Sequence, residues 1–149
     1  MYVLKSYPFN KEGLSELKKL EPFPSVYIIE NGNEIYIGEG IDPVKRLKTH
    51  LRDKKVDSPA KMHIISNYDF NVSVAKDLES YLIQLIKAEG KYKMINKDQL
   101  GIRHNYYMKN SYQQRFNHIW KNLIEMGIGH SSEEEIKNTQ IYEFSPFKS

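Results

Sequence analysis

Arg46 and His50 are four residues apart in a segment predicted to be helical, so their side chains are expected on one flank of that helix. A guanidinium can hold a phosphate through two parallel hydrogen bonds, and an imidazole one helical turn away can accept or relay a proton near neutral pH. The same spacing also occurs on ordinary solvated helix faces. By itself the pair permits phosphate chemistry but does not establish it.

Glu79 is a second candidate because its neighbours at helical spacing are apolar. Those neighbours are Ala75, Leu82, Ile83 and Ile86. An ionised carboxylate on or beside an apolar helix face is costly unless it is paired or binds a metal. Two interpretations remain open. Glu79 either reaches solvent at the rim and pairs with Lys76, or it binds a hard divalent cation such as Mg²⁺, which needs few protein carboxylates.

Tyr27 and Tyr36 lie in residues 25–38, a segment that predicts a β-hairpin. Asn31-Gly32 favours a two-residue type I′ loop. That loop places Tyr27 directly opposite Tyr36 on one face and collects the aliphatic side chains on the other. The two phenols, followed by Gly38, either line a cleft for a phosphate or a water, or form only a stabilising cross-strand pair.

The remaining periodicities predict the elements that must position these side chains. Residues 2–7 form a short strand or an extended arm, residues 61–66 a strand, and residues 92–96 a short extended segment. Helices are expected over residues 11–20, 43–55, 73–87 and 111–126, with a final short helix after a Ser132–Glu135 capping box. The predicted fold is a single α+β domain with a small three-stranded antiparallel sheet flanked by helices.

Charge is concentrated locally. The chain has 22 Lys and Arg against 19 Asp and Glu, a net charge of +3, which excludes a polyelectrolyte tail as its means of binding. Residues 42–61, however, contain seven basic residues against three aspartates. Lys45, Lys48 and Arg52 share the helix flank opposite Arg46 and His50. This segment could face a nucleic acid, or it could be a solvated helix face.

Composition restricts the class of protein further. The 149 residues suit one domain, 40% hydrophobic content suits an ordered globular fold, and the absence of cysteine excludes disulfides and thiolate metal sites. No apolar stretch is long enough for a membrane span, and the first residues do not read as a signal peptide. A cytoplasmic protein is therefore expected. Two loop features stay open: Asn96 could be a turn residue or a site residue, and residues 104–107 could pack on the domain or stack on bases.

The order of these features resembles the GIY-YIG nuclease domain over about residues 25–97. Ser25-Val26-Tyr27 stands at the first motif, with serine for glycine and valine for isoleucine, and Tyr36-Ile37-Gly38 matches the second. Arg46 and His50 match the helix pair, Glu79 the metal-binding glutamate and Asn96 the late asparagine.

The resemblance implies a catalytic set and a cofactor. The members of the catalytic set are Tyr27, Tyr36, Arg46, His50, Glu79 and Asn96. Gly38 and the basic residues Lys45, Lys48 and Arg52 are expected to bind the substrate. It implies one Mg²⁺ or Mn²⁺ held by Glu79, and a water activated by Tyr27 with His50 as proton acceptor. The expected reaction is hydrolysis of DNA phosphodiester bonds, with RNA not excluded.

The flanking segments extend the resemblance. Residues 1–24 and 98–149 look like the extensions of GIY-YIG domains found at the N-terminus of bacterial helicase-type ATPases, so a C-terminal ATPase is expected in a longer chain. The chain itself has no Walker A motif. The alternatives are a catalytically silent nucleic-acid-binding domain with the same fold and, third, a protein-interaction domain in which the tyrosines and Glu79 are structural.

Overall fold

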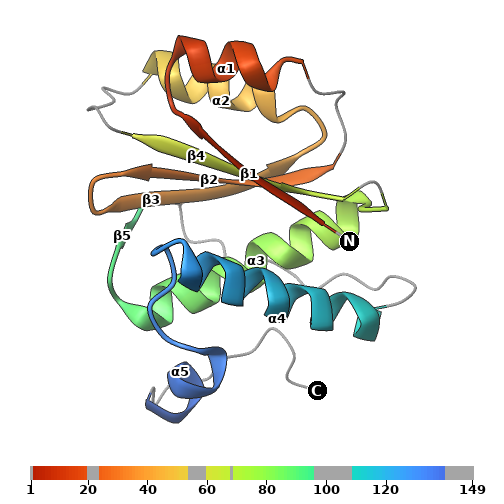
Figure 1. The fold of residues 1–149 in the computed structure, drawn as a ribbon, viewed down its shortest axis with the longest axis vertical. Coiled ribbons are helices and arrows are strands. Elements are labelled where there is room, and N and C mark those ends of the chain that lie inside the picture. The colour runs from red at the N-terminus through yellow and green to blue at the C-terminus, as the bar shows by residue number, and fades with distance from the viewer. Residues whose placement is uncertain (1, 20–23, 54–59, 68, 96–108, 140–149) are drawn as a thin grey trace.

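The computed structural model describes residues 2–19, 24–53, 60–67, 69–95 and 109–139 (Figure 1). Five strands form one sheet in the order β1-β4-β2-β3-β5. They are β1 (Val3–Pro8), β2 (Ser25–Asn31), β3 (Glu34–Gly40), β4 (Lys61–Ser66) and β5 (Lys93–Met94). Only the β3–β5 pair is parallel.

The α+β class is confirmed, but the predicted three-stranded antiparallel sheet is wrong. Two edge strands were missing from it. β1 pairs with β4 along its whole length, and β5 adds two residues beside β3. Both segments were expected to be extended, but neither has an alternating buried pattern that would place it in the sheet, because β1 is mostly exposed and β5 is too short to show a period.

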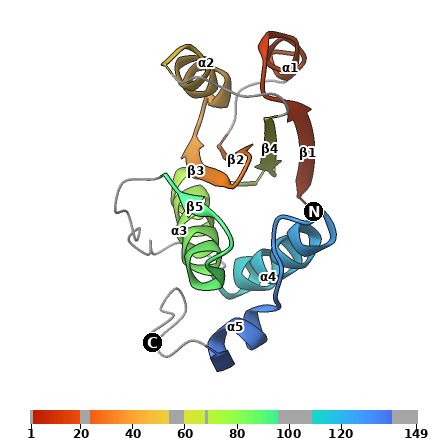
Figure 2. The same ribbon diagram turned by 90° about the vertical axis from the view of Figure 1, so that its left-hand side faces the viewer.

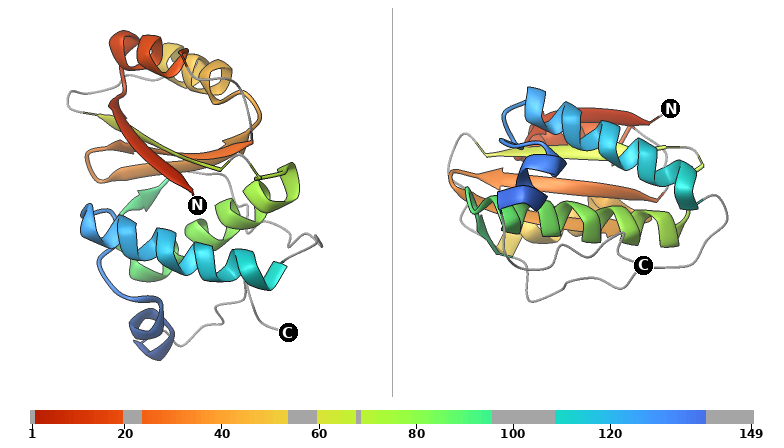
Figure 3. Two further views of the ribbon diagram at one scale, coloured as in Figure 1. Left: turned by 45° about the vertical axis from the view of Figure 1, so that its right-hand side comes forward. Right: turned by 90° about the horizontal axis from the view of Figure 1, so that it is seen from below.

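Helices cover both faces of the sheet. α1 (Lys11–Leu17) and α2 (Pro43–Asp53) lie over one face. α3 (Val72–Glu89) and α4 (Lys109–Glu125) lie side by side under the other, and α5 (Glu133–Thr139) packs on α3 (Figures 2 and 3). All five predicted helices are present, with ends shifted by up to three residues.

Helix caps account for several of these ends. The Asn10 side chain accepts a hydrogen bond from the Gly13 backbone N–H, and Gly90 ends α3 in the left-handed conformation at φ 69°. Ser132 and Glu135 form the predicted capping box, each side chain accepting from the other's backbone N–H at 3.1 Å.

Two hydrophobic cores lie on opposite sides of the sheet because side chains alternate along its strands. Val26, Ile28, Ile35 and Ile37 face the larger core, which contains the buried sides of α3 and α4. Tyr27 and Ile29 face the smaller core under α1 and α2. The predicted division of the hairpin into an aliphatic face and a phenolic face is therefore confirmed.

The predicted hairpin register is wrong by one loop position. The two-residue loop is Gly32-Asn33, so Asn31 pairs with Glu34, and Tyr27 lies opposite Gly38 instead of Tyr36. Between the predicted and the observed register, the partner of each residue moves by two positions. A shift of two positions leaves every side chain on its predicted face of the sheet. Tyr27 and Tyr36 are thus diagonal neighbours.

Residues on either side of the 25–97 segment contact each other. The Tyr2 hydroxyl lies 2.8 Å from His118 Nδ1 and accepts a hydrogen bond from Asn122 Nδ2 at 2.9 Å, which fastens the start of β1 to α4. Apolar residues of α4, including Phe116 and Trp120, complete the larger core. No helix within the described ranges has the length and apolar character required to cross a membrane.

Candidate active site

An open pocket of about 660 Å³ lies where the end of β3 meets the beginning of α2 and of α3. Tyr36 and Glu39 reach it from β3, Lys45 and Arg46 from α2, and Val72 from α3. The chain turns directly from β3 into α2 here, because Asp42 and Pro43 stand at the start of that helix and the Asp42 carboxylate accepts from the Lys45 backbone N–H at 3.4 Å. The turn therefore brings the second tyrosine motif and the basic helix to one opening.

Tyr27 and Tyr36 form a stacked pair with different exposure. Their ring centroids are 6.1 Å apart and the rings are inclined by 22°. Tyr27 is completely buried, whereas Tyr36 is half-buried and lines the pocket. Of the two phenols, Tyr36 is the one placed to meet a ligand.

The environment of Tyr27 makes its hydroxyl hard to ionise. Burial raises the pKa of Tyr27 well above its ordinary value, and the neighbouring Tyr36 raises it further, while the charge of Arg46 opposes the shift. A phenol with a raised pKa is almost entirely protonated near neutral pH, so Tyr27 has almost no phenolate with which to accept a proton from water. Its buried ring is the surface on which the Tyr36 ring stacks.

The absence of a side chain at Gly38 leaves room for the Tyr27 ring. A Cβ atom at residue 38 would lie 2.5 Å from both Cζ and the hydroxyl oxygen of Tyr27, far inside contact distance. The ring therefore occupies the space that any other residue's side chain would need. Gly38 was predicted to bind substrate, but the Tyr27 ring covers it and it is buried.

Glu79 projects from α3 toward the end of β3. Its carboxylate accepts a hydrogen bond from the Glu39 backbone N–H. Burial raises the pKa of Glu79 to about 7, the negative charge of Glu39 adds to the increase, and Lys76 and Arg46 oppose it. The predicted helix-face position is confirmed. Lys76 makes its ion pair with Glu39, at 3.9 Å.

Glu79 has the chemistry of a ligand for a hard divalent cation. It offers carboxylate oxygens in a half-buried position beside a second carboxylate, that of Glu39. Within the ranges that the structure describes, no group of three or more His, Asp or Glu side chains could hold a metal ion. A cation here would take most of its ligands from water and substrate oxygens, which is the usual arrangement for Mg²⁺.

The predicted site residues separate into three groups. Tyr27, Tyr36, Arg46 and Glu79 are brought together, as the electrostatic influence of Arg46 on both Tyr27 and Glu79 also shows. Lys45 lines the pocket and Lys48 is exposed on the same helix. The side chains of His50 and Arg52, and residue Asn96 as a whole, lie outside the described residues.

Two further residues belong to this region. Glu39 was not predicted as a site residue. Its position immediately after Tyr36-Ile37-Gly38 could have indicated that it lies beside the same opening. Ser25, which replaces the glycine of the first motif, is 1% exposed and its hydroxyl donates to the Gly40 carbonyl at 3.5 Å. The serine is thus accommodated inside the β2–β3 ladder.

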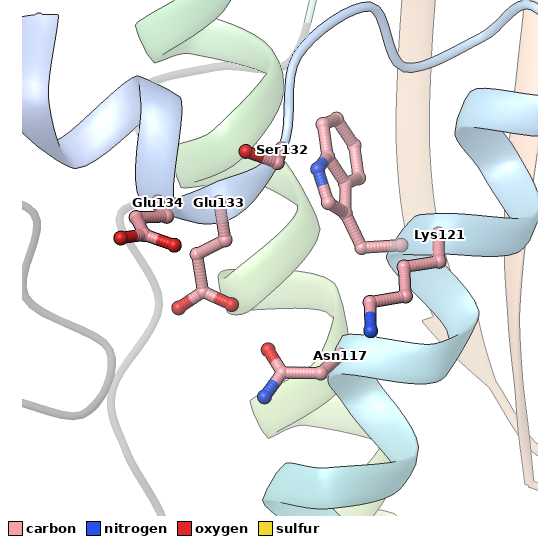
Figure 4. Close-up of a pocket in the computed structure, with 6 residues that line it drawn as sticks. Asn117, Lys121, Ser132, Glu133 and Glu134 are labelled. Atoms are coloured by element: carbon pink, nitrogen blue, oxygen red, sulfur yellow. The ribbon is translucent and has the colours of Figure 1, made fainter.

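A second pocket, of about 420 Å³, lies between α4 and α5, on the far side of the sheet from α2 (Figures 1 and 4). Lys121, Asn117 and Glu133 line it. The Tyr81 hydroxyl contacts Asn117 Oδ1 at 3.0 Å and Glu133 Oε2 at 2.8 Å. This pocket shares no residue with the opening around Tyr36.

Comparison with protein families agrees with this geometry. Residues 23–93 match the model of the GIY-YIG catalytic domain. The matched segment runs from the start of β2 to β5 and includes every described residue of the Tyr36 pocket. Comparison with curated proteins and with solved structures gives no match.

The match gives the class of this segment. Residues 23–93 form a GIY-YIG catalytic domain, a domain of the nuclease and phosphodiesterase type. A nucleic acid is the substrate class that such a domain implies.

Proposed function

We propose that the chain is a metal-dependent endonuclease domain that hydrolyses DNA phosphodiester bonds by in-line attack of water. The observation that carries this proposal is that Arg46 and Tyr36 line one opening beside a basic helix, with Glu79 next to Glu39 of the same opening. An arginine and a nearby carboxylate can hold a phosphate from two sides. The arginine binds the phosphate directly, and the carboxylate binds it through a cation. RNA remains open as a substrate.

Each side chain has a separate task in this proposal. The Arg46 guanidinium binds the non-bridging oxygens of the scissile phosphate and stabilises the charge that develops on them. Glu79 would hold Mg²⁺ or Mn²⁺, which supplies Lewis-acid stabilisation of the phosphate and of the leaving oxygen. Tyr36, at the pocket wall, orients the attacking water or the phosphate, and the buried ring of Tyr27 supports Tyr36 by stacking on it.

Three further roles extend the proposal. His50 accepts the proton released from the attacking water, and Asn96 helps to position the phosphate. Lys45, Lys48 and Arg52 bind neighbouring phosphates along the strand. The resemblance of the flanking segments supports attachment to a C-terminal helicase-type ATPase in a longer chain, acting in the cytoplasm.

Supercoiled-plasmid nicking tests the proposal directly. Purified protein is expected to convert supercoiled DNA to nicked DNA with Mg²⁺ or Mn²⁺ and not with EDTA. Glu79→Ala should abolish nicking while its circular dichroism spectrum and melting temperature stay close to those of the wild type. Glu34→Gln, which changes a carboxylate on β3 with a partly exposed side chain outside the pocket, is the control that should retain activity.

Two outcomes would overturn the proposal. Equal nicking by the wild type and by Glu79→Ala would identify a contaminating nuclease as the source. Salt-sensitive DNA binding without cleavage under any divalent metal would favour the catalytically silent binding domain.

A further inference from the structure

Glu39 places a carboxylate at the Tyr36 pocket, next to Glu79 on α3. It follows Gly38 on β3 and lines the Tyr36 pocket. Its side chain is only 17% exposed. Its backbone N–H donates to the Glu79 carboxylate, so β3 and α3 are in direct contact through these two residues.

The cation that faces Glu39 belongs to the protein itself. Lys76 stands three residues before Glu79 on α3, and its Nζ lies 3.9 Å from Glu39 Oε1. The same ammonium acts electrostatically on Glu79. One positive charge thus serves two carboxylates, and the Lys76 side chain is 45% exposed, so the ammonium can withdraw into solvent.

Stabilisation of the fold by the Glu39–Lys76 ion pair does not explain why two carboxylates lie together. At 3.9 Å the Glu39–Lys76 contact is at the outer limit of an ion pair, and a partly exposed pair at that distance contributes little to stability. Placing a second carboxylate beside Glu79 is costly, since like charges in a half-buried position repel each other. A divalent cation removes that cost for both residues at once, and Mg²⁺ commonly takes one or two protein carboxylates.

We propose that Glu39 is a second carboxylate ligand of the divalent cation, in addition to Glu79, and that the Lys76 ion pair holds Glu39 in the pocket until the cation binds. This inference rests on the proposed function, since it concerns the same metal site. It adds a ligand from β3 to the one from α3, so that the cation joins the strand that bears Tyr36 to the helix that bears Glu79.

Binding of Mn²⁺ without DNA tests the proposal, with Kd measured by isothermal titration calorimetry at a pH well above 7. Glu39→Gln is expected to raise Kd by at least about tenfold, the smaller end of the loss that even an outer-sphere partner of a metal causes. Glu39→Asp keeps the charge but shortens the side chain, and it should also raise Kd. Lys76→Gln should lower Kd, because the competing ammonium is removed.

Asp42→Asn is the matched control, since Asp42 lines the same pocket and the substitution removes the same charge. A Kd for Glu39→Gln no higher than that of Asp42→Asn, or an unchanged Kd for Glu39→Asp, would show that Glu39 acts only through its charge and would overturn the inference. The proposed function fails separately, through an unchanged Kd for Glu79→Gln. Melting curves in EDTA establish whether each variant is folded. If Glu39→Gln does not fold, the Kd of Glu39→Asp tests whether Glu39 binds the cation.

Discussion

The Tyr27 ring lies over Gly38, its partner across the β2–β3 ladder, with no room for a methyl group between them. The glycine of the second motif and the tyrosine of the first are therefore complementary parts of one packing arrangement. Tyr36, two residues before Gly38, stacks on the same ring and reaches the pocket. The position of the exposed phenol thus depends on a glycine that is itself buried.

Gly38→Ala should lower both stability and activity. The added Cβ would meet Tyr27 at 2.5 Å, and the ring cannot withdraw because Tyr27 is completely buried. Overpacking of this kind costs about 1–3 kcal/mol. Urea unfolding measures the loss, and plasmid nicking should fall with it because Tyr36 loses its support.

Gly40→Ala is the control for stability, since nothing lies within 4 Å of a Cβ there and its φ is not positive. Its free energy of unfolding should stay near that of the wild type. An equal loss in the two variants would mean that the effect arises from backbone freedom in β3, not from contact with Tyr27.

Metal binding should strengthen as pH rises through 7. Burial and the charge of Glu39 raise the pKa of Glu79 to about 7, and a cation binds only the ionised carboxylate. Below that pKa the Kd for Mn²⁺ should rise by about tenfold per pH unit, and above it the Kd should level off. Calorimetry in two buffers of different ionisation enthalpy would also detect the proton released near pH 7.

Glu39→Gln supplies an internal check on this pH dependence. Since the Glu39 charge raises the pKa of Glu79, removing it should move the midpoint of the pH profile to lower pH. A Kd that does not change between pH 6 and pH 8, which are roughly one unit on either side of the raised pKa, would contradict the assignment of Glu79 as the titrating ligand.

The double variant Lys45→Gln/Lys48→Gln should weaken DNA binding and reduce its dependence on salt. Both residues lie on α2, and Lys45 lines the pocket. Each lost phosphate contact should reduce the slope of log K against log salt by about 0.9 for duplex DNA. Fluorescence anisotropy in EDTA, where no cleavage occurs, measures the slope.

Lys87→Gln/Lys121→Gln removes the same charge from exposed positions on α3 and α4, on the opposite face of the sheet. That control should leave the slope unchanged. If the two double variants behaved alike, binding would depend on net charge and not on the α2 surface.

His63 should contribute strongly to stability, because it links three strands. Its Nδ1 lies 2.7 Å from Ser6 Oγ on β1 and its Nε2 lies 2.7 Å from Glu30 Oε1 on β2, while the residue is 3% exposed. His63→Phe leaves Glu30 without this partner and should cost roughly 1–3 kcal/mol in urea unfolding. Ser6→Ala, which removes only the exposed end of the chain of contacts, should cost less.

The same network sets a pH dependence of stability. The hydrogen bond from His63 lowers the pKa of Glu30 below its ordinary value. Glu30 therefore contributes stability above its unfolded pKa, and the contribution is lost as pH falls through the lower, folded value. In His63→Phe the difference from wild type should accordingly shrink in acid. A difference that stays constant from neutral pH to strong acid would contradict this account.

Sequence patterns predicted which side chains share a face, and where helices end, better than they predicted which residues pair across strands. Alternation along residues 25–38 determines which side chains share a face, but registers shifted by two residues satisfy it equally. Loop preference favoured Asn31-Gly32, whereas the observed Gly32-Asn33 loop places Gly38 opposite the ring of Tyr27. That requirement is a tertiary contact, so local turn preference could not reveal it.

The candidate site was predictable residue by residue but not as a set of contacts. Arg46 and Glu79 could be found from helical spacing, and the order of the motifs connected them to the tyrosines. Glu39 was missed because its contact with Glu79 joins β3 to α3 across 40 residues of sequence. The buried state of Tyr27, which assigns the exposed position to Tyr36, likewise depends on how α1 and α2 cover the sheet.

The hydrogen bonds between Tyr2 and α4 have a practical consequence for expressing the protein. β1 and α4 both lie outside residues 23–93, and each covers part of the domain that the other does not. A chain shortened to the matched residues would leave the edge of β4 unpaired and the larger core open on its α4 side. Such an edge invites intermolecular strand pairing, so the shortened chain should aggregate where the longer one stays monodisperse.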